Sequence, residues 1–218
     1  MIRPFPSMVN VLVLVAAAAF LVPCPAGAAQ KPSLDLLRRA TDPNPGLQSY
    51  TANAQLSATL RAVVPIKKSY PGNVYYLRPK RKIEFQGVSG PLSKFKDLVT
   101  STPTYEEAAA TYSISPLDDN GTESTYLLVP KKTGSRVKSL NVHINDRSAL
   151  LDRAEWSYND GSSLSVDQTY QNVGNFRLPA KSTIAARYPA YRVDGTLTFS
   201  GYVPNAPVAP SVFESPKP

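Results

Sequence analysis

The chain has 218 residues and carries 24 Lys and Arg against 16 Asp and Glu, a formal net charge of +8. Its length is sufficient for one domain with a sizeable core. Because the basic residues are scattered and the chain is predicted to be exported, nucleic acid is not an expected partner. The charge fits an anionic membrane surface or lipid headgroups, or else a solvated surface that keeps the protein soluble.

Residues 1–29 have the organisation of a secretory signal peptide. Arg3 supplies the positive start, Val9 to Val22 form an apolar core, and Ala26-Gly27-Ala28 precede the expected cleavage after Ala28 or Ala29. The apolar run is too short to span a membrane comfortably. We therefore predict a periplasmic protein. Loss of Arg3 leaves 24 − 1 basic residues against 16 acidic ones, a net charge of +7.

The only cysteine, Cys24, lies within the segment to be removed. An alternative interpretation makes it the acylated cysteine of a lipoprotein. Pro23 fits that interpretation poorly, because lipoprotein processing requires small residues before the cysteine, so lipid anchoring through Cys24 is not expected. Without this cysteine the exported protein has no disulfide and depends on its core alone.

The first predicted element of the mature chain is a short helix from Ser33 to about Thr41. Ser33 is a typical N-cap residue, and Leu34 and Leu37 form a narrow apolar stripe. The segment Asp42-Pro43-Asn44-Pro45-Gly46 ends the helix, because neither proline can continue it.

A long strand is predicted next. Every even-numbered residue from Tyr50 to Val64 is apolar, and the residues between them are mainly polar, which is the period of a β-strand with one apolar face. Half of the apolar residues are alanines, whose small side chains leave room beside the sheet. We therefore predict the wall of an apolar cavity, formed by Ala52, Ala54, Leu56, Ala58 and Leu60. Alternatively, these residues simply pack as core beneath helices.

The segment that follows combines a turn, a strand and helical spacing. Tyr70-Pro71-Gly72-Asn73 is typical of a turn, and Val74 to Phe85 of a second strand. Between Pro91 and Thr111, helical periodicity and a capping-box pattern at Thr104 and Glu107 predict two short helices interrupted at Thr102-Pro103.

The remainder of the chain is predicted to be a meander of strands joined by turn residues. Its strands are Thr125–Pro130, Val137–Asn145, Leu150–Tyr158, Ser163–Val173, Lys181–Arg187 and Tyr191–Tyr202. Few helices and many strands indicate an α+β fold, in which the helices cover one face of an antiparallel sheet. We expect one domain over residues 30–203, followed by a proline-rich tail over residues 204–218.

Several segments of the chain resemble the LolA-like superfamily of periplasmic lipoprotein carriers and their relatives. The resemblance spans about residues 31–202 and is carried by Gly72 to Pro79, Tyr126 to Lys131 with Val137 to Ile144, and Leu150 to Tyr170. The end, from Leu178-Pro179-Ala180 through Val193 to Phe199, is similar to the broader superfamily, which includes regulators of envelope-stress signalling. The resemblance implies an unclosed antiparallel β-barrel, or half-barrel, with helices lidding its concave apolar face.

The resemblance also implies roles for particular residues. Arg78 matches an arginine that, in the family, hydrogen-bonds the backbone of the lid helix and keeps the cavity closed. Alternatively, Arg78 is a surface arginine beside Lys80, Arg81 and Lys82. Within Gln86 to Thr111, which departs from the family's aromatic hairpin, the inner face of the lid is expected to be Leu92, Phe95 and Leu98. Tyr76 and Trp156 complete the predicted lipid-binding cavity.

Motifs for catalysis or metal binding are missing from the sequence. There is no G-x-S-x-G motif, no phosphate-binding glycine loop and no metal-spaced cluster, and His143 is the only histidine. We therefore expect no catalytic residue, no cofactor and no metal. His143 is expected to be an outward-facing strand residue.

The expected function is a carrier that binds the acyl chains of a lipid or lipoprotein and transfers it between envelope membranes. Membrane-anchored donor and acceptor proteins are the expected partners, and the carrier itself is expected to be a monomer. One alternative is a periplasmic module that senses lipid or lipoprotein and regulates an envelope-stress or other membrane-protein partner. Another is a structural domain whose helices fill its own groove.

Overall fold

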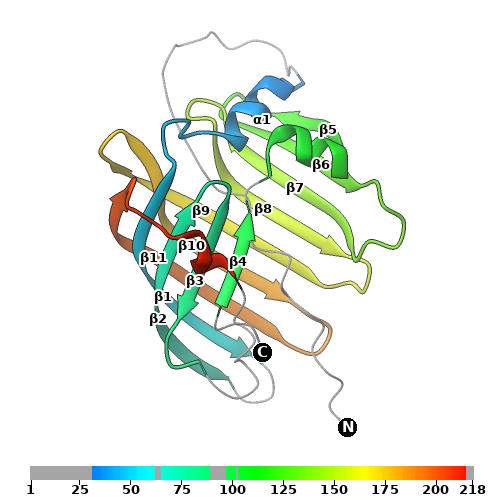
Figure 1. Ribbon diagram of the computed structural model, residues 1–218. Helices are drawn as coiled ribbons and strands as arrows, with labels where there is room; N and C mark the ends of the chain where they lie inside the picture. The colour runs from blue at the N-terminus through cyan, green and yellow to red at the C-terminus, as the bar shows by residue number, and fades with distance from the viewer. Residues whose placement is uncertain (1–30, 62–64, 89–96, 102, 215–218) are drawn as a thin grey trace.

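The architecture is one antiparallel sheet with two short helices on its inner face (Figure 1). The computed structural model describes residues 31–61, 65–88, 97–101 and 103–214. Eleven strands occur in the order β4-β3-β2-β1-β11-β10-β9-β8-β7-β6-β5, so β4 and β5 are edges and the sheet is not closed. The predicted α+β half-barrel is therefore confirmed.

The helices are α1 (Leu34–Thr41) and α2 (Tyr105–Thr111), and a 3-10 helix, η2 (Pro210–Phe213), follows the last strand. The strands are β1 (Ser49–Arg61), β2 (Ile66–Leu77), β3 (Lys80–Phe85), β4 (Asp97–Ser101), β5 (Tyr112–Asp119), β6 (Glu123–Pro130), β7 (Val137–Asn145), β8 (Leu150–Tyr158), β9 (Ser163–Val173), β10 (Phe176–Arg187) and β11 (Arg192–Pro204).

Strand β1 is the long alternating strand that the sequence predicts, and it lies inside the curved sheet, fourth from the β4 edge. It pairs with β2 on one side and with β11 on the other, so that the start and the end of the domain lie side by side. Tyr50, Ala52 and Ala54 are buried, and the intervening Asn53 and Gln55 are exposed. Residues 62–64, the predicted end of this strand, lie outside the described residues.

The turn predicted at Tyr70–Asn73 is wrong, because β2 continues through it. The predicted single strand Val74–Phe85 is also wrong: it is a hairpin of β2 and β3 that turns at Arg78 and Pro79, which are joined by a cis peptide bond. The inner face continues through Gly72, where a Cβ atom would lie 2.7 Å from the Glu84 carbonyl oxygen and 2.9 Å from the Phe85 ring. Glycine is therefore required at this position by close packing inside a strand, and does not mark a turn.

Part of the predicted helical lid is also wrong. Asp97–Ser101 forms β4, in which Leu98 is paired with Ile83 of β3, whereas Leu92 and Phe95 lie outside the described residues. Pairing with β4 satisfies backbone N–H and C=O groups that would otherwise be unpaired at the edge of β3. This gain outweighs the helical spacing of the apolar residues.

The second predicted helix, α2, is confirmed together with its capping box. The Glu107 backbone N–H donates to the Thr104 hydroxyl over 3.2 Å, and the Thr104 backbone N–H donates to the Glu107 carboxylate over 2.8 Å. These two bonds satisfy donors that a helix start leaves without intrahelical partners.

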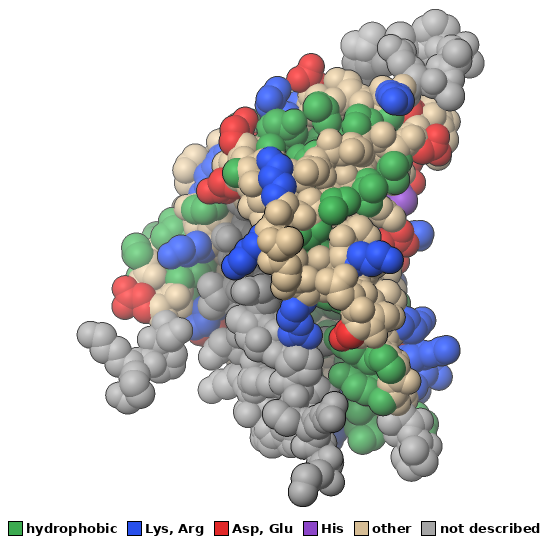
Figure 2. Space-filling model, turned by 90° about the vertical axis from the view of Figure 1, so that its right-hand side faces the viewer, with side chains coloured by type: hydrophobic (Ala, Val, Ile, Leu, Met, Phe, Trp, Pro, Cys, Tyr) green, Lys and Arg blue, Asp and Glu red, His purple; other side chains and the backbone are tan. Residues whose placement is uncertain are grey.

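The segment after β11 continues across the sheet instead of ending at its edge. The Asn205 side chain accepts from the Gln48 backbone N–H, the Ser49 hydroxyl donates to the Ala206 carbonyl, and η2 packs against β3. Within the described part of the chain, no helix is long and apolar enough to cross a membrane. On the flank seen in Figure 2, Lys and Arg side chains gather at the lower right and are spread singly elsewhere.

The buried apolar residues form two clusters. The first packs α1 and α2 against β6 to β10 and contains Leu36, Leu37, Tyr126 and Trp156. The second lies over β1 to β3, β10 and β11 and includes Leu47, Tyr50, Ala52, Ala54, Val74, Ile83, Phe85, Leu178, Leu197 and Phe199. The helices therefore cover only one half of the inner face.

Candidate functional site

The predicted cavity wall on β1 changes character along the strand. Ala52 and Ala54 are 6% and 4% exposed and belong to the second core cluster, whereas Leu56, Ala58 and Leu60 are only half-buried. The first two are therefore packed in the core, although no helix residue of the described chain belongs to their cluster. The last three remain available to a ligand.

Residues of β11 and β10 extend this half-buried region across the sheet. In register with Ala58 lie Gly195 and then Ile184, and Leu60 lies beside Val193. We call this region the inner apolar strip: Leu56, Ala58, Leu60, Ile184, Val193 and Gly195. Sequence reasoning missed its last three members. Gly195 was the signal in the sequence that could have indicated them. An isolated glycine within a strand marks a place where another group approaches the backbone closely or where no side chain fills the space.

Gly195 leaves one side-chain position of the strip unfilled. A Cβ atom built there would lie 3.7 Å from the Ile184 Cβ and 4.0 Å from the Ala58 Cβ, which is ordinary contact. The backbone of Gly195 is not in the left-handed region, so a larger residue could adopt its conformation. The glycine therefore keeps space open between Ala58 and Ile184.

The start of β1 is closed by aromatic side chains. Tyr50 stacks on Tyr76 with ring centroids 4.9 Å apart and meets Tyr202 edge-on at 5.3 Å. Burial raises the pKa of Tyr50 and of Tyr76 above the usual value. Tyr76, a predicted cavity residue, thus lies at the sealed end of the inner face, away from the inner apolar strip.

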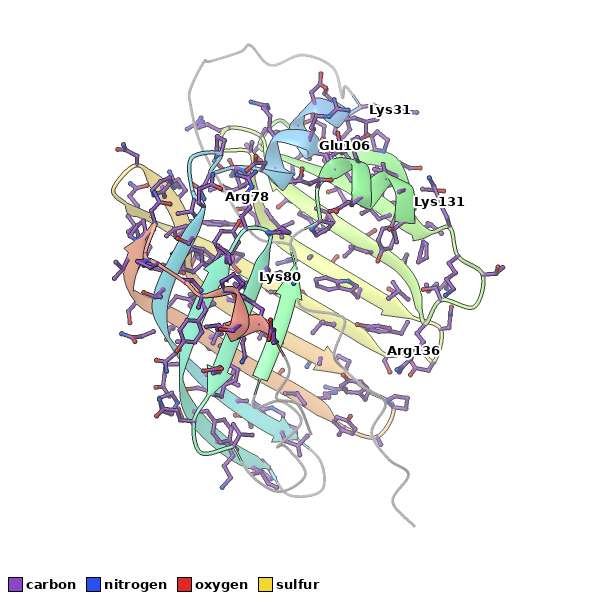
Figure 3. The ribbon with its side chains drawn as sticks, in the orientation of Figure 1. Lys31, Arg78, Lys80, Glu106, Lys131 and Arg136 are labelled. Atoms are coloured by element: carbon purple, nitrogen blue, oxygen red, sulfur yellow. The ribbon has the colours of Figure 1, made fainter. Side chains whose placement is uncertain are left out.

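Arg78 joins the β2–β3 turn to the segment that follows α1. Its Nη1 donates to the Pro45 carbonyl over 3.1 Å, and its Nη2 pairs with the Asp42 carboxylate. The predicted arginine therefore does contact the backbone next to a helix, although the contact is to the loop beyond α1 and not to the helix itself. In Figure 3, Arg78 lies below α1, far from Lys131 and Arg136.

A cavity of about 290 Å³ lies beside Arg78. It is lined by the end of α1, the loop after it, the start of α2 and the aromatic end of the inner face; its charged members are Arg38, Asp42, Arg78, Arg81 and Glu106. Arg38 lies 4.5 Å from the Tyr105 ring centroid and 3.6 Å from the Glu106 carboxylate. The volume is at the lower limit of ordinary ligand pockets, about 300 Å³.

Trp156 is separated from the other predicted cavity residues. It is 8% exposed and lies in the first core cluster, with Leu36 and Leu37 of α1. Of the predicted lid residues, only Leu98 is described, and it lies on a strand. The structure therefore groups Leu56, Ala58 and Leu60, but divides Ala52, Ala54, Tyr76, Trp156 and Arg78 between two cores and a turn.

A second depression, of about 540 Å³, lies where β2, β1, β11 and β10 run side by side. Its lining includes Ala58, Gly195 and Ile184 of the inner apolar strip, Lys68 in register with Ala58, and the residues that flank them along each strand. Three of the six residues of the strip therefore line this depression.

The polar side chains of the described residues form ion pairs and not reactive clusters. As predicted, His143 faces outward on β7, where its Nδ1 lies 3.0 Å from Glu123 and its Nε2 lies 3.3 Å from Glu155. Among the residues described, no group of three or more His, Cys, Asp or Glu could hold a metal ion.

Comparison with known proteins identifies the fold by structure and not by sequence. No family model matches the chain, and no curated protein matches it. A LolA superfamily protein from Nitrosomonas europaea has a TM-score of 0.55 at 10% identity, over 84% of this chain and 97% of that one. A domain named for outer membrane lipoprotein sorting, from Vibrio parahaemolyticus, has a TM-score of 0.57 at 12% identity, over 83% and 95%.

A DUF1329 family protein from Desulfovibrio piger has a TM-score of 0.51 at 11% identity, over 83% of this chain and 95% of that one. Together these likenesses confirm the resemblance noted in the sequence at the level of the fold.

Proposed function

We propose that this protein is a periplasmic carrier that binds the acyl chains of a lipid or lipoprotein and transfers it between envelope membranes. The observation that carries the proposal is the inner apolar strip on the concave face of an unclosed sheet, in which five half-buried apolar side chains surround the buried Gly195. The fold, shared with a lipoprotein-sorting domain, supports it.

Binding of this kind requires apolar surface and no reactive groups. Each methylene removed from water contributes about 0.8 kcal/mol, so a long acyl chain in a closely fitting pocket would be released very slowly. The alanine and glycine of the strip reduce contact area, which favours release to an acceptor. Binding without catalysis and without a cofactor is accordingly part of the proposal.

In this proposal, Arg78 holds the loop after α1 against the sheet. Opening this contact would free the loop after α1 from the β2–β3 turn and widen the inner face for a ligand. Arg78 thus acts as a lid-closing residue, while Ala52, Ala54 and Tyr76 form the packed floor and end of the site.

The test is to fill the strip without changing the core. Ala58→Trp places an indole on the inner face, and Gly195→Leu fills the empty position between Ala58 and Ile184. Gln55→Trp is the matched control, because this residue of the same strand is exposed on the other face and does not line the depression. Ala54→Trp is unsuitable, since Ala54 is fully packed in register with Phe199.

Affinity for a fluorescent fatty acid or an acylated peptide is measured by titration, with melting temperature as the check on folding. We expect both inner variants to lose at least about tenfold in affinity, equivalent to about 1.4 kcal/mol, and the control to bind like the wild type. Undiminished binding by both inner variants would contradict the assignment of the site.

A transfer assay separates a carrier from a lipid-sensing regulator. The loaded protein is mixed with acceptor vesicles, and movement of the acylated ligand is followed. A carrier delivers its ligand to the acceptor, whereas a sensor retains it.

A further inference from the structure

Basic side chains gather at one end of the sheet although they are scattered in the sequence. The register places the last residues of β1, β6, β8 and β10 beside the first residues of β2, β5, β7, β9 and β11. This basic end carries Arg61, Lys67, Lys68, Lys131, Lys132, Arg136, Arg187 and Arg192, all of them exposed.

Carboxylates are few at the same end. Among the described residues there, Asp194 already bridges Arg61 and Arg187 at 2.8 Å each, and Asp160 accepts from the Ser162 backbone N–H. The opposite end of the sheet is mixed, since its turns and strand ends contain Asp118, Asp119 and Asp146 as well as Arg78, Lys80 and Arg147. The excess positive charge of the chain is therefore concentrated at the basic end.

Apolar and aromatic groups accompany these charges. Ile66, the first residue of β2, is 48% exposed, and Tyr188 and Tyr191 stack at the β10–β11 turn with ring centroids 4.6 Å apart. Tyrosine combined with Lys and Arg suits a membrane interface, where one part of each side chain is apolar and the other is hydrated.

The inner apolar strip extends to the basic end of the sheet. Ala54 is buried, whereas Ala58 and Leu60, nearer the basic end, are half-exposed, and Ile66 is in register with Leu60. Lys68, in register with Ala58, lies at the margin of the strip. A surface that met the basic end would meet the open end of the strip as well.

We propose that the basic end docks on the surface of an anionic phospholipid bilayer and so presents the inner apolar strip to the membrane. A bilayer is the occupant that matches both features, since its phosphates complement the Lys and Arg side chains and its apolar layer accepts Ile66 and the tyrosines. In Figure 3, Lys131 and Arg136 mark this end, away from Arg78 and α1.

Docking is separable from the proposed acyl-chain binding. Gly195→Leu is expected to weaken acyl binding and leave docking intact, because the in-register neighbours of Gly195 are the uncharged Ala58 and Ile184. Removal of basic side chains has the reverse effect. The failure of one proposal is therefore distinguishable from the failure of the other.

The test compares two variants that lose the same charge. The docking variant combines Lys67→Gln, Lys132→Gln, Arg136→Gln and Arg192→Gln, four exposed residues without an ion pair to another described residue. Its control combines Lys31→Gln, Arg39→Gln, Lys80→Gln and Arg147→Gln, exposed residues that also lack such a pair and lie away from the basic end. Equal melting temperatures show that both variants remain folded.

Binding of the processed protein to vesicles is measured by sedimentation, with phosphatidylglycerol-containing and purely phosphatidylcholine vesicles, in about 0.1 M salt. A basic residue near an anionic surface contributes about fivefold to partitioning, so the docking variant should lose more than about tenfold and the control less than about threefold. Higher salt should weaken wild-type binding. Equal losses in both variants, or wild-type binding that ignores anionic lipid, would overturn the proposal.

Discussion

Arg78 illustrates what a single residue contributes to this fold. Its guanidinium reaches both a carbonyl and a carboxylate of the loop after α1, a geometry that a lysine cannot reproduce because it lacks the planar fork. The sequence resemblance predicted a contact with the lid backbone. It could not give the exact partners, because these depend on where the loop Asp42–Gly46 packs in three dimensions.

Replacing Arg78 should loosen the loop without unfolding the sheet. We expect Arg78→Ala to lower the free energy of unfolding by about 0.5–1.5 kcal/mol, the range for partly exposed charged hydrogen bonds, and to speed the release of a bound acyl probe. Arg147→Ala, at an exposed turn position, is the control. Stopped-flow release rates that are equal in the two variants would contradict a lid-closing role.

Asp194 gives a prediction about pH. Hydrogen bonds from Arg187 and Arg61 lower its pKa below the usual value, so the folded state favours the ionised carboxylate. The stabilisation is present above the unfolded pKa of about 3.9 and is lost as the pH falls through the lower folded pKa.

Asp194→Asn should therefore lower stability at pH 7 by about 0.2–1 kcal/mol, as for exposed ion pairs. The difference from the wild type should shrink as the pH is lowered below about 4. Urea unfolding at a series of pH values measures both. A difference that stays constant on acidification would exclude the carboxylate as its source.

At the scale of elements, α1 is attached to the sheet by one buried tyrosine and by packing. The Tyr126 hydroxyl donates to the Ser33 carbonyl over 2.6 Å, and Leu36 and Leu37 pack into the first core cluster. Burial raises the pKa of Tyr126 to about 12, so its hydroxyl remains a donor at all physiological pH values.

Tyr126→Phe should release the start of α1. Loss of this hydrogen bond costs about 1 kcal/mol and should speed hydrogen exchange of the α1 amides by about fivefold, as 1.4 kcal/mol corresponds to tenfold. Tyr170→Phe, which removes a bond to the Leu151 carbonyl, is the control, because it lies within the sheet. Exchange in α1 that is equal in both variants would show that packing alone holds the helix.

Elements with strong local signals could be predicted from the sequence. The alternation of β1 and the capping box of α2 are properties of neighbouring residues, and both occur as expected. The turn at Tyr70–Asn73 and the helix through Leu98 were wrong because Gly72 and Leu98 are positioned by β3, a partner that local spacing does not include. Likewise, the alternation of apolar and polar residues shows that Ala54 and Ala58 lie on the same face of β1. It does not show that Ala54 is buried and Ala58 only half-buried.

At the scale of the whole molecule, the fold separates a sealed end from an open one. Helix α1, the aromatic cluster around Tyr50 and the Arg78 contact close one end of the inner face. The inner apolar strip and the basic side chains meet at the other. This difference between the two ends arises from the order and register of the strands. The sequence therefore predicted the half-barrel without predicting which of its ends opens.

The central claim is that the inner face holds acyl chains, and native mass spectrometry tests it most directly. The processed protein is purified from an envelope fraction without detergent, alongside Ala58→Trp. We predict a discrete added mass on the wild type that lipid extraction removes and that the variant lacks. A wild-type mass equal to that of the bare chain, unchanged after incubation with phospholipid and acylated peptide, would contradict the account.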